Sequence, residues 1–289
     1  MSQVIFCVDV GGTKTAFAVF TPAGTELAYG RFATEAERGA EDLVARLYEK
    51  ASPYLEGAEV TCGVVAAPGP LDAEAGVLID VVTMGWKNVK LTELLSQKFG
   101  FVFSLLNDCD AGALGVWRFG GYADCKSLAY VSVSTGIGGG LVIDGKLVTG
   151  KGNAANFGHI PIAGKGQTCG CGRKDCVELY ASGMGIEREW LEQTGEHATC
   201  AQIADMARAG NRRANAVFMR AGTLLAQAMS AVRAVIDPEK IVFGGSVTKA
   251  GDLLFPPFIR AFGENPIVYK DEDGKQVLYG ALAYGLQRL

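Results

Sequence analysis

VIFCVDVGGTKTAFAVF, residues 4–20, contains two apolar, β-rich runs separated by a pair of glycines. Val4–Asp9 and Thr15–Phe20 have the composition of strands, and Gly11 and Gly12 predict a turn between them. A third run, Leu27–Phe32, is expected to pair with the second strand after a turn. The sequence therefore predicts that the chain begins with a small antiparallel sheet.

A similar series begins at residue 128. Leu128–Ser134 and Gly138–Ile143 are expected strands on either side of a glycine-rich turn. Lys146–Val148 follows through Asp144-Gly145, a strong hairpin signal. The repeated order of strand, glycine turn, strand and hairpin indicates an internal duplication, and hence two α/β lobes.

The remaining pattern alternates strands and helices, which is typical of an α/β protein. We expect strands at 60–66, 102–106 and 241–243, and helices at 39–52, 91–99, 110–117, 187–193, 201–209, 212–236 and 277–289. We predict an N-terminal lobe at 1–117, a C-terminal lobe with a metal loop at 118–275, and a C-terminal helix at 276–289 that packs back on the first lobe.

Composition limits the classes of function. The 289 residues are 49% hydrophobic and 20% charged, which supports a large core and excludes disorder as a general state. The net charge of −4 leaves no basic face for a polyanion, so we expect no nucleic-acid partner. The chain begins without a leader pattern, and its apolar runs are shorter than a bilayer span, so we expect a cytoplasmic protein without a membrane partner.

Two glycine turns could hold a triphosphate, because glycines let backbone N–H groups approach an anion. Asp9 could hold Mg²⁺ through water. The candidate nucleotide-contacting residues are Asp9, Gly11, Gly12, Thr13 and Lys14 in the first turn, Thr135, Gly136 and Gly138 in the second, and Gly244 and Gly245 in a third turn. The alternative is that each is a structural hairpin turn. None matches a P-loop or a GxGxxG dinucleotide fingerprint.

A carboxylate suited to act as a base ends an expected buried strand. Asp108 follows Asn107 directly before a predicted helix, and polar groups at such strand ends commonly contact ligands. A sugar hydroxyl is a weak nucleophile, so transfer of a phosphoryl group to it needs a group that accepts its proton. The alternative is a helix cap formed by this pair, and Asp110 competes with Asp108 for either role.

The third motif is a cluster of metal-ligand residues. His159, Cys169, Cys171 and Cys176 supply one imidazole and three thiolates, the ligand set of a closed tetrahedral zinc site. A closed site leaves no position for an activated water, so we expect structural Zn²⁺. Glu178 lies two residues beyond the last thiolate and is expected to be aimed by the metal loop. The alternatives are free loop thiols and a Glu178 that only begins a helix.

Together these motifs resemble the ROK family of bacterial repressors and sugar kinases. The resemblance runs through nearly the whole chain. It implies a two-lobed, actin-like and ribonuclease H-like ATPase fold, usually a homodimer, with ATP and Mg²⁺ as cofactors. It implies that Asp108 is the catalytic base and that the sugar is held by Gly69, Asn107, Asp108, Asn156, His159 and Glu178.

The resemblance also implies phosphorylation of the 6-hydroxyl of a hexose or an N-acylhexosamine, with N-acetylmannosamine favoured. Asn156 stands where the family usually has a sugar-binding Glu, and Thr83 where it has Asn. Glucose and fructose therefore stay open as acceptors. A repressor is disfavoured because the first strand begins at Val4, which leaves no space before it for a helix-turn-helix. A sugar sensor without catalysis is disfavoured by Asp108 and the glycine turns.

Overall fold

The computed structural model describes residues 3–288 of the chain. These residues divide into two compact units. Unit 1 comprises 3–124, 149–154 and 271–288, and unit 2 comprises 125–148 and 155–270. No helix within 3–288 combines the length and the apolar character needed to cross a membrane.

Unit 1 is built on a five-stranded sheet in the order β3-β2-β1-β4-β8. Its strands are β1 (Gln3–Val10), β2 (Lys14–Phe20), β3 (Glu26–Ala33), β4 (Glu59–Ala67) and β8 (Phe103–Asn107). The first three are antiparallel, and β4 and β8 continue the sheet parallel to β1. The predicted initial hairpin strands are confirmed, and the predicted strand at 102–106 lies one residue later.

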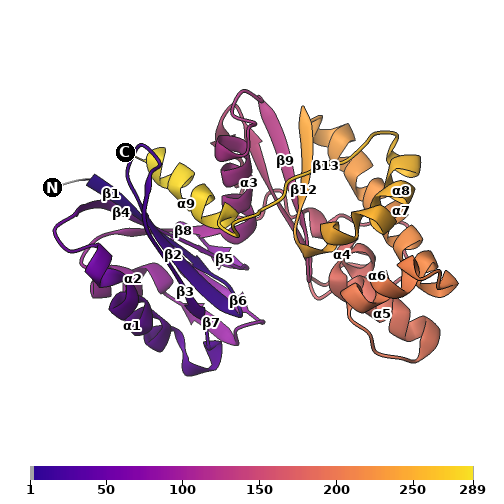
Figure 1. Ribbon diagram of the computed structural model, residues 1–289, viewed down its shortest axis with the longest axis horizontal. Coiled ribbons are helices and arrows are strands. Elements are labelled where there is room, and N and C mark those ends of the chain that lie inside the picture. The colour runs from indigo at the N-terminus through magenta and orange to yellow at the C-terminus, as the bar shows by residue number, and fades with distance from the viewer. Residues whose placement is uncertain (1–2, 289) are drawn as a thin grey trace. The chain divides into compact units, whose positions relative to one another are not determined.

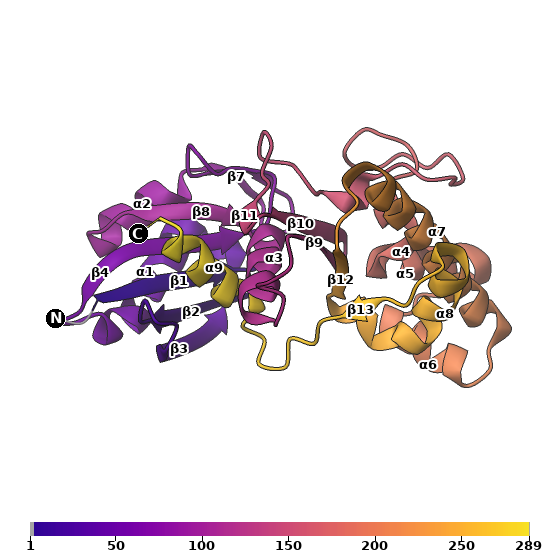
Figure 2. The same cartoon turned by 90° about the horizontal axis from the view of Figure 1, so that it is seen from above.

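Helices cover both faces of this sheet (Figure 1). Even-numbered side chains of β1 face α1 (Ala40–Ala51) and α2 (Leu91–Phe99), whereas Ile5 and Cys7 face α9 (Gln276–Leu286). Because β1 is buried on both faces, it is an almost continuous apolar run. Helix α9 lies along α3 (Asp108–Phe119), as Figure 2 also shows.

A second, three-stranded sheet in unit 1 was absent from the predicted elements. It consists of β5 (Leu71–Asp72), β6 (Val77–Val81) and β7 (Trp86–Val89), and two 3-10 turns, η1 (Ala36–Arg38) and η2 (Ser52–Tyr54), lie elsewhere in the unit. These strands are too short, and too interrupted by Gly and acidic residues, to give a period-2 pattern.

Unit 2 repeats the topology of unit 1. Its sheet has the order β11-β10-β9-β12-β13. The strands are β9 (Ser127–Val133), β10 (Ile137–Ile143), β11 (Lys146–Leu147), β12 (Lys240–Gly244) and β13 (Ile267–Val268). The first three are again antiparallel, and the last two parallel to the first. The predicted duplication is confirmed, and this is the ribonuclease H-like sheet, present twice, of the actin-like ATPase fold.

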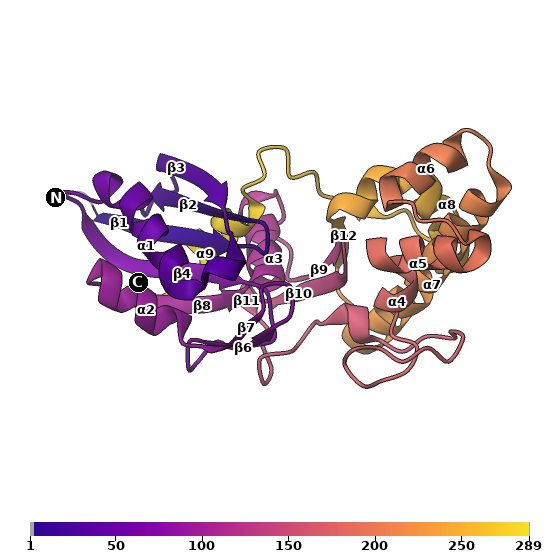
Figure 3. The same ribbon diagram turned by 90° about the horizontal axis from the view of Figure 1, so that it is seen from below.

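Helices gather on one face of the unit 2 sheet (Figure 3). They are η3 (Phe157–His159), α4 (Glu178–Ala181), α5 (Gly183–Thr194), α6 (Cys200–Arg208), α7 (Arg212–Ile236), η4 (Ser246–Ala250) and α8 (Gly251–Phe262). The bounds predicted for α7 are confirmed. Helix α8 was not predicted, because Pro256 and Pro257 lie inside it and proline normally ends helices.

Candidate active site and metal centre

The first group of candidate residues lies in unit 1, at the carboxyl ends of parallel strands. Asp9 pairs with Ala66 across β1 and β4, and Ala67 pairs with Asn107 across β4 and β8. All these strand ends therefore share one edge of the sheet. In open α/β sheets this edge is where ligands bind.

The first glycine turn is closed by its own backbone. The nitrogen of Gly11 donates to the carbonyl oxygen of Lys14 at 3.0 Å, and a Cβ on Gly11 would lie 2.9 Å from that oxygen. The turn is also braced by Thr34, a residue that no motif in the sequence marks. The Thr34 hydroxyl donates to the carbonyl oxygen of Gly11 at 2.6 Å. The backbone nitrogen of Thr34 donates to the carbonyl oxygen of Thr13 at 3.0 Å.

The side chains of this turn are available to a ligand. Gly12, Thr13 and Lys14 are exposed. A Cβ on Gly12 would lie 3.6 Å from the hydroxyl oxygen of Thr83. The side chain of Thr83 therefore lies beside the turn, within reach of a ligand that contacts Gly12.

Asp9 is in an environment that suits a divalent cation. Burial, followed by the negative charge of Asp108, raises the pKa of Asp9 to about 7, with Arg31 acting in the opposite direction. A bound Mg²⁺ would offset the repulsion between the two carboxylates. The donor chemistry fits Mg²⁺, which prefers carboxylate and water oxygens.

The side-chain amide of Asn107 can cap a helix through its oxygen and contact a ligand through its nitrogen. The side-chain oxygen accepts from the backbone nitrogens of Cys109 at 2.9 Å and Asp110 at 3.4 Å, so the helix-cap interpretation is correct. The amide nitrogen lies beside Gly69, where a Cβ would be 3.4 Å away. The cap thus uses only the acceptor and leaves the donor directed toward the expected sugar-binding glycine.

Asp108 is the first residue of α3. One carboxylate oxygen accepts from the nitrogen of Cys109 at 2.8 Å. Burial raises the pKa of Asp108, and hydrogen bonds from Cys109 partly oppose this effect. A carboxylate with a raised pKa is a better proton acceptor at neutral pH, which is what a general base requires.

Asp110, the competing carboxylate, is buried, with only 9% of its surface exposed. Its Oδ1 has no hydrogen-bond partner among residues 3–288. Burial, followed by the charge of Asp108, raises the pKa of Asp110 to about 7. Asp108 is half-buried, so it has the more exposed surface of the two residues.

The second glycine turn lies in unit 2, between β9 and β10. The nitrogen of Ser134 donates to the oxygen of Gly136 at 2.9 Å, and the nitrogen of Gly183 donates to the oxygen of Ser134 at 2.7 Å. Thr135 is exposed at its tip, whereas Gly138 pairs with Ser132 inside the β9–β10 ladder. The start of α5 therefore holds this turn in place.

A pocket of about 480 Å³ adjoins the second turn. Its lining comes from the turn, α5, α6 and η4, and comprises Ser134, Thr135, Gly183, Met184, Glu187, Cys200, Ala201, Ala204, Asp205, Arg208, Ser246, Val247, Lys249 and Ala250. The α5 and α6 residues of this lining were not predicted, because their spacing is simply that of amphipathic helices. The pocket has a volume suited to a small-molecule ligand.

Gly244 and Gly245 lie close to β9. A Cβ on Gly244 would collide with Tyr130, and one on Gly245 with the Val133 backbone. Gly245 also has a φ of +90°, which disfavours any other residue. These glycines bring the following residue, Ser246, to the pocket, where its hydroxyl is 3.0 Å from that of Ser134.

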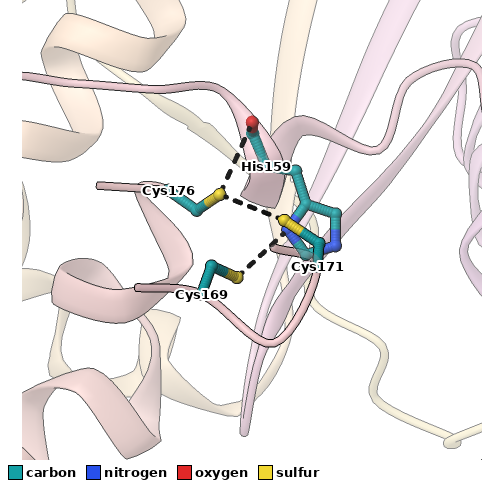
Figure 4. Close-up of side chains that lie close together, drawn as sticks. All are labelled: His159, Cys169, Cys171 and Cys176. Carbon is teal, nitrogen blue, oxygen red and sulfur yellow. Dashed lines mark hydrogen bonds between the residues drawn. The ribbon is translucent and has the colours of Figure 1, made fainter. Parts of the chain in front are cut away.

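The four predicted metal ligands converge (Figure 4). Their ligand atoms all lie within 4.8 Å of one another. Cys171 and Cys176 have their sulfurs 3.5 Å apart, and the Cys169 sulfur is 3.7 Å from Nδ1 of His159. A tetrahedral zinc with bonds of about 2.3 Å separates its sulfur ligands by roughly 3.7 Å, so this cluster fits Zn²⁺.

Beside the cluster, the second ring nitrogen of His159 and the side chain of Asn156 are available for other contacts, and Glu178 lies close by in sequence. Because Nδ1 of His159 faces the sulfurs, Nε2 stays available to a hydroxyl. Asn156 is exposed, and its carbonyl oxygen accepts from the His159 nitrogen at 3.1 Å. Glu178 begins α4, so the helix-start interpretation is correct, and its carboxylate also accepts from the Ile137 nitrogen at 2.9 Å.

The family model described as the ROK family matches residues 5–277. A glucokinase of Thermotoga maritima is 31% identical over 266 residues, covering 86% of this chain and 84% of the relative. An N-acetylmannosamine kinase of Yersinia pestis is 32% identical over 242 residues, covering 83% and 82%. A ROK family glucokinase from Streptomyces griseus, solved with glucose and AMPPNP, aligns with a TM-score of 0.78 at 27% identity, covering 98% and 99%.

Proposed function

The chain belongs to the ROK family, and from this premise we propose that it transfers the γ-phosphoryl group of ATP to the 6-hydroxyl of a hexose or N-acylhexosamine, with N-acetylmannosamine as the preferred acceptor. The enzyme class is that of the ATP-dependent sugar kinases. The observation that carries the proposal is the location of Asp108. It begins α3 at the same sheet edge as Asp9 and the first glycine turn.

Asp108 is proposed as the catalytic base. Its carboxylate accepts the proton of the 6-hydroxyl as the oxygen attacks the γ-phosphorus of ATP. Asn107 donates its free amide to a neighbouring sugar hydroxyl, and Gly69 allows the sugar to approach the backbone. From unit 2, His159 donates through Nε2, Glu178 accepts through its second carboxylate oxygen, and Asn156 contacts the sugar.

The nucleotide is proposed to use both glycine turns. The backbone nitrogens of Gly12 and Gly136, with Thr13, Lys14 and Thr135, bind the phosphates, while Gly11, whose nitrogen is bonded to the oxygen of Lys14, shapes the first turn. The pocket beside Ser246 receives the adenosine portion. Asp9 would hold Mg²⁺ through water, and the ion would neutralise phosphate charge. Gly138, Gly244 and Gly245 shape the turns that carry these contacts.

The Cys₃His cluster is proposed to hold structural Zn²⁺. His159, Cys169, Cys171 and Cys176 would hold the ion with four protein ligands and leave no open position for water. Its function is to order the loop that carries His159 and leads to Glu178. The chain is further proposed to act as a homodimer in the cytoplasm, where ATP is available and thiolates stay reduced.

N-acetylmannosamine is preferred as the acceptor because of Asn156. An uncharged amide replaces a carboxylate that would pair with sugar hydroxyls, and an N-acetyl group needs both a donor and an acceptor. The relative from Yersinia pestis is an N-acetylmannosamine kinase. Glucose is the alternative acceptor, since the Thermotoga maritima relative is a glucokinase at similar identity.

A panel of sugars tests the assignment. ADP release should be measured with N-acetylmannosamine, N-acetylglucosamine, glucose, fructose and mannose, each at several concentrations. We expect the largest kcat/KM for N-acetylmannosamine. A larger kcat/KM for glucose or fructose would change the assigned acceptor and leave the assignment as a sugar kinase. ADP release that does not depend on any sugar would favour a sensor.

A further inference from the structure

Residues beside the metal ligands contact both backbone polar groups of Ile137, the first residue of β10 after the second glycine turn. On one side, the carboxylate Oε2 of Glu178 accepts the N–H of Ile137 at 2.9 Å. On the other side, Gly158, which precedes the metal ligand His159, lies so close to the Ile137 carbonyl oxygen that a Cβ would collide with it. Gly158, next to His159, and Glu178, two residues after Cys176, thus lie on either side of the residue that ends the turn.

The contact with Glu178 is tightly packed. A Cβ on Gly136 would lie 2.5 Å from Oε2 of Glu178. The side chain therefore lies against the turn itself and has little freedom to move without moving Ile137. A carboxylate acceptor also makes a stronger hydrogen bond than a neutral one.

The position of Glu178 in turn depends on the metal loop. Cys176 precedes it by two residues, and the nitrogen of the intervening Val177 donates to the oxygen of Ile160 at 3.0 Å. Between Gly164 and Lys174 only Cys169 is buried, and polar contacts of Lys165 and Gln167 with α5 fix only the first part of the loop. A metal bound by Cys169 and Cys171 would order the rest.

We propose that Glu178 is a positioning residue that connects metal binding to nucleotide binding, through its hydrogen bond to Ile137 in the second glycine turn. The inference rests on the proposed function, in which this turn binds the phosphates of ATP. It adds a second role for Glu178, in which one carboxylate oxygen holds the turn and the other stays free for the sugar.

The coupling is expected to be partial. The turn is also held by the nitrogens of Gly183 and Met184, which donate to the oxygens of Ser134 and Thr135 at 2.7 and 3.2 Å. These bonds come from α5 and do not involve Glu178. Loss of the metal should therefore weaken nucleotide binding by about tenfold, within the usual range of coupling between sites, without abolishing it.

The test is a comparison of Mg²⁺·ADP affinity in metal-loaded and metal-stripped protein, without sugar. The metal is removed with a zinc-selective chelator that is then itself removed, and Mg²⁺ is kept in excess. In the wild type we expect the Kd for ADP to rise by about tenfold on stripping. Glu178→Gln keeps an oxygen that can accept from Ile137 as a weaker, neutral acceptor, so it should keep most of the wild-type response.

Glu178→Ala removes the connection. Its loaded form should already bind ADP about tenfold more weakly than the wild type, and stripping should change its Kd by less than about threefold. Glu264→Gln is the control for charge, because Glu264 is an exposed residue that pairs with Arg233 rather than with the turn or the metal loop. It should behave as the wild type does.

Coupling is reciprocal, so a second measurement uses only loaded protein. At equilibrium with a coloured chelator of matched affinity, ADP should lower the fraction of zinc transferred from the wild type and from Glu178→Gln, but not from Glu178→Ala. If metal removal leaves the ADP affinity unchanged, or if Glu178→Ala responds as the wild type does, the role of Glu178 is overturned and the proposed kinase function still stands. If loaded wild-type protein does not bind ADP at all, the proposed function falls and the inference with it.

Discussion

Asn107 Oδ1 accepts a hydrogen bond from the backbone nitrogen of Cys109 at 2.9 Å. This bond caps α3 directly after β8. It fixes Asp108, which lies between Asn107 and Cys109, at the carboxyl-end edge of the sheet. Because the cap uses the side-chain oxygen, the amide nitrogen remains for a ligand. The two halves of the Asn107 amide can therefore be separated by mutation.

Asn107→Ala and Asn107→Ser form a matched pair. Serine is also a good helix cap but lacks an amide donor, whereas alanine lacks both. We expect Asn107→Ala to lower the free energy of unfolding by about 1 kcal/mol and Asn107→Ser to change it little. Both should raise the KM for the sugar, as measured by steady-state kinetics. A normal KM in Asn107→Ser would exclude the amide as a sugar ligand.

Asp110→Asn should make stability less dependent on pH. The folded state holds the pKa of Asp110 near 7, above its usual value of about 4, so unfolding favours ionisation. The resulting cost to stability is absent below about pH 4, grows between about pH 4 and 7, and is complete above about pH 7.

Asparagine removes this cost because it does not ionise. We therefore expect Asp110→Asn to exceed the wild type in free energy of unfolding by on the order of 2–4 kcal/mol at about pH 8, and to match it near pH 4. Urea denaturation at the two pH values provides the measurement. A variant that is less stable than the wild type at about pH 8 would show that ionised Asp110 has a stabilising partner.

Cys169→Ala should lose the metal, since three ligands hold zinc far less tightly than four. We expect about one zinc per chain in the wild type, near zero in the variant, and increased proteolysis within 160–176. The control is Cys125→Ser, because the Cys125 sulfur bonds the Ser127 oxygen outside the cluster and serine can keep that bond. Full zinc content in Cys169→Ala would refute the ligand set.

Gly136→Ala disturbs the contact between the turn and Glu178 from the opposite side. The added Cβ would lie 2.5 Å from Oε2 of Glu178, so the carboxylate must shift away from Ile137. We expect weaker ADP binding by about tenfold, with zinc content unchanged. Gly170→Ala is the matched control, since a Cβ there would meet no atom within 4 Å. Equal effects of the two substitutions would contradict this account.

Much of the fold follows from local signals. The bounds of α7 are set by Asn211, whose side chain caps the first turn, and by Asp237, which ends the helix in a left-handed conformation before Pro238. Likewise, the spacing of the cysteines was enough to identify a four-ligand cluster. Such features depend on residues near one another in sequence, so a single sequence contains them.

Other features depend on contacts between distant segments. The Thr34 hydroxyl braces the first turn from 23 residues away, and nothing in its own neighbourhood marks it. The pocket beside Ser246 combines turn residues with two helices of ordinary pattern. Helix α8 tolerates Pro256 and Pro257 because it packs against α7, where Gly222 gives it space. Only the packed structure reveals these relationships.

The central claim is that Asp108 takes the proton from a sugar 6-hydroxyl during transfer from ATP. The most direct test is to incubate the wild type and Asp108→Asn with ATP, Mg²⁺ and the best sugar of the panel, and to follow the phosphorylated carbon by NMR. We expect 6-phosphate from the wild type and a rate roughly 10²–10⁴-fold lower from Asp108→Asn, with zinc content and fold unchanged. A near-normal rate in the variant, or phosphate on another hydroxyl, would contradict the account.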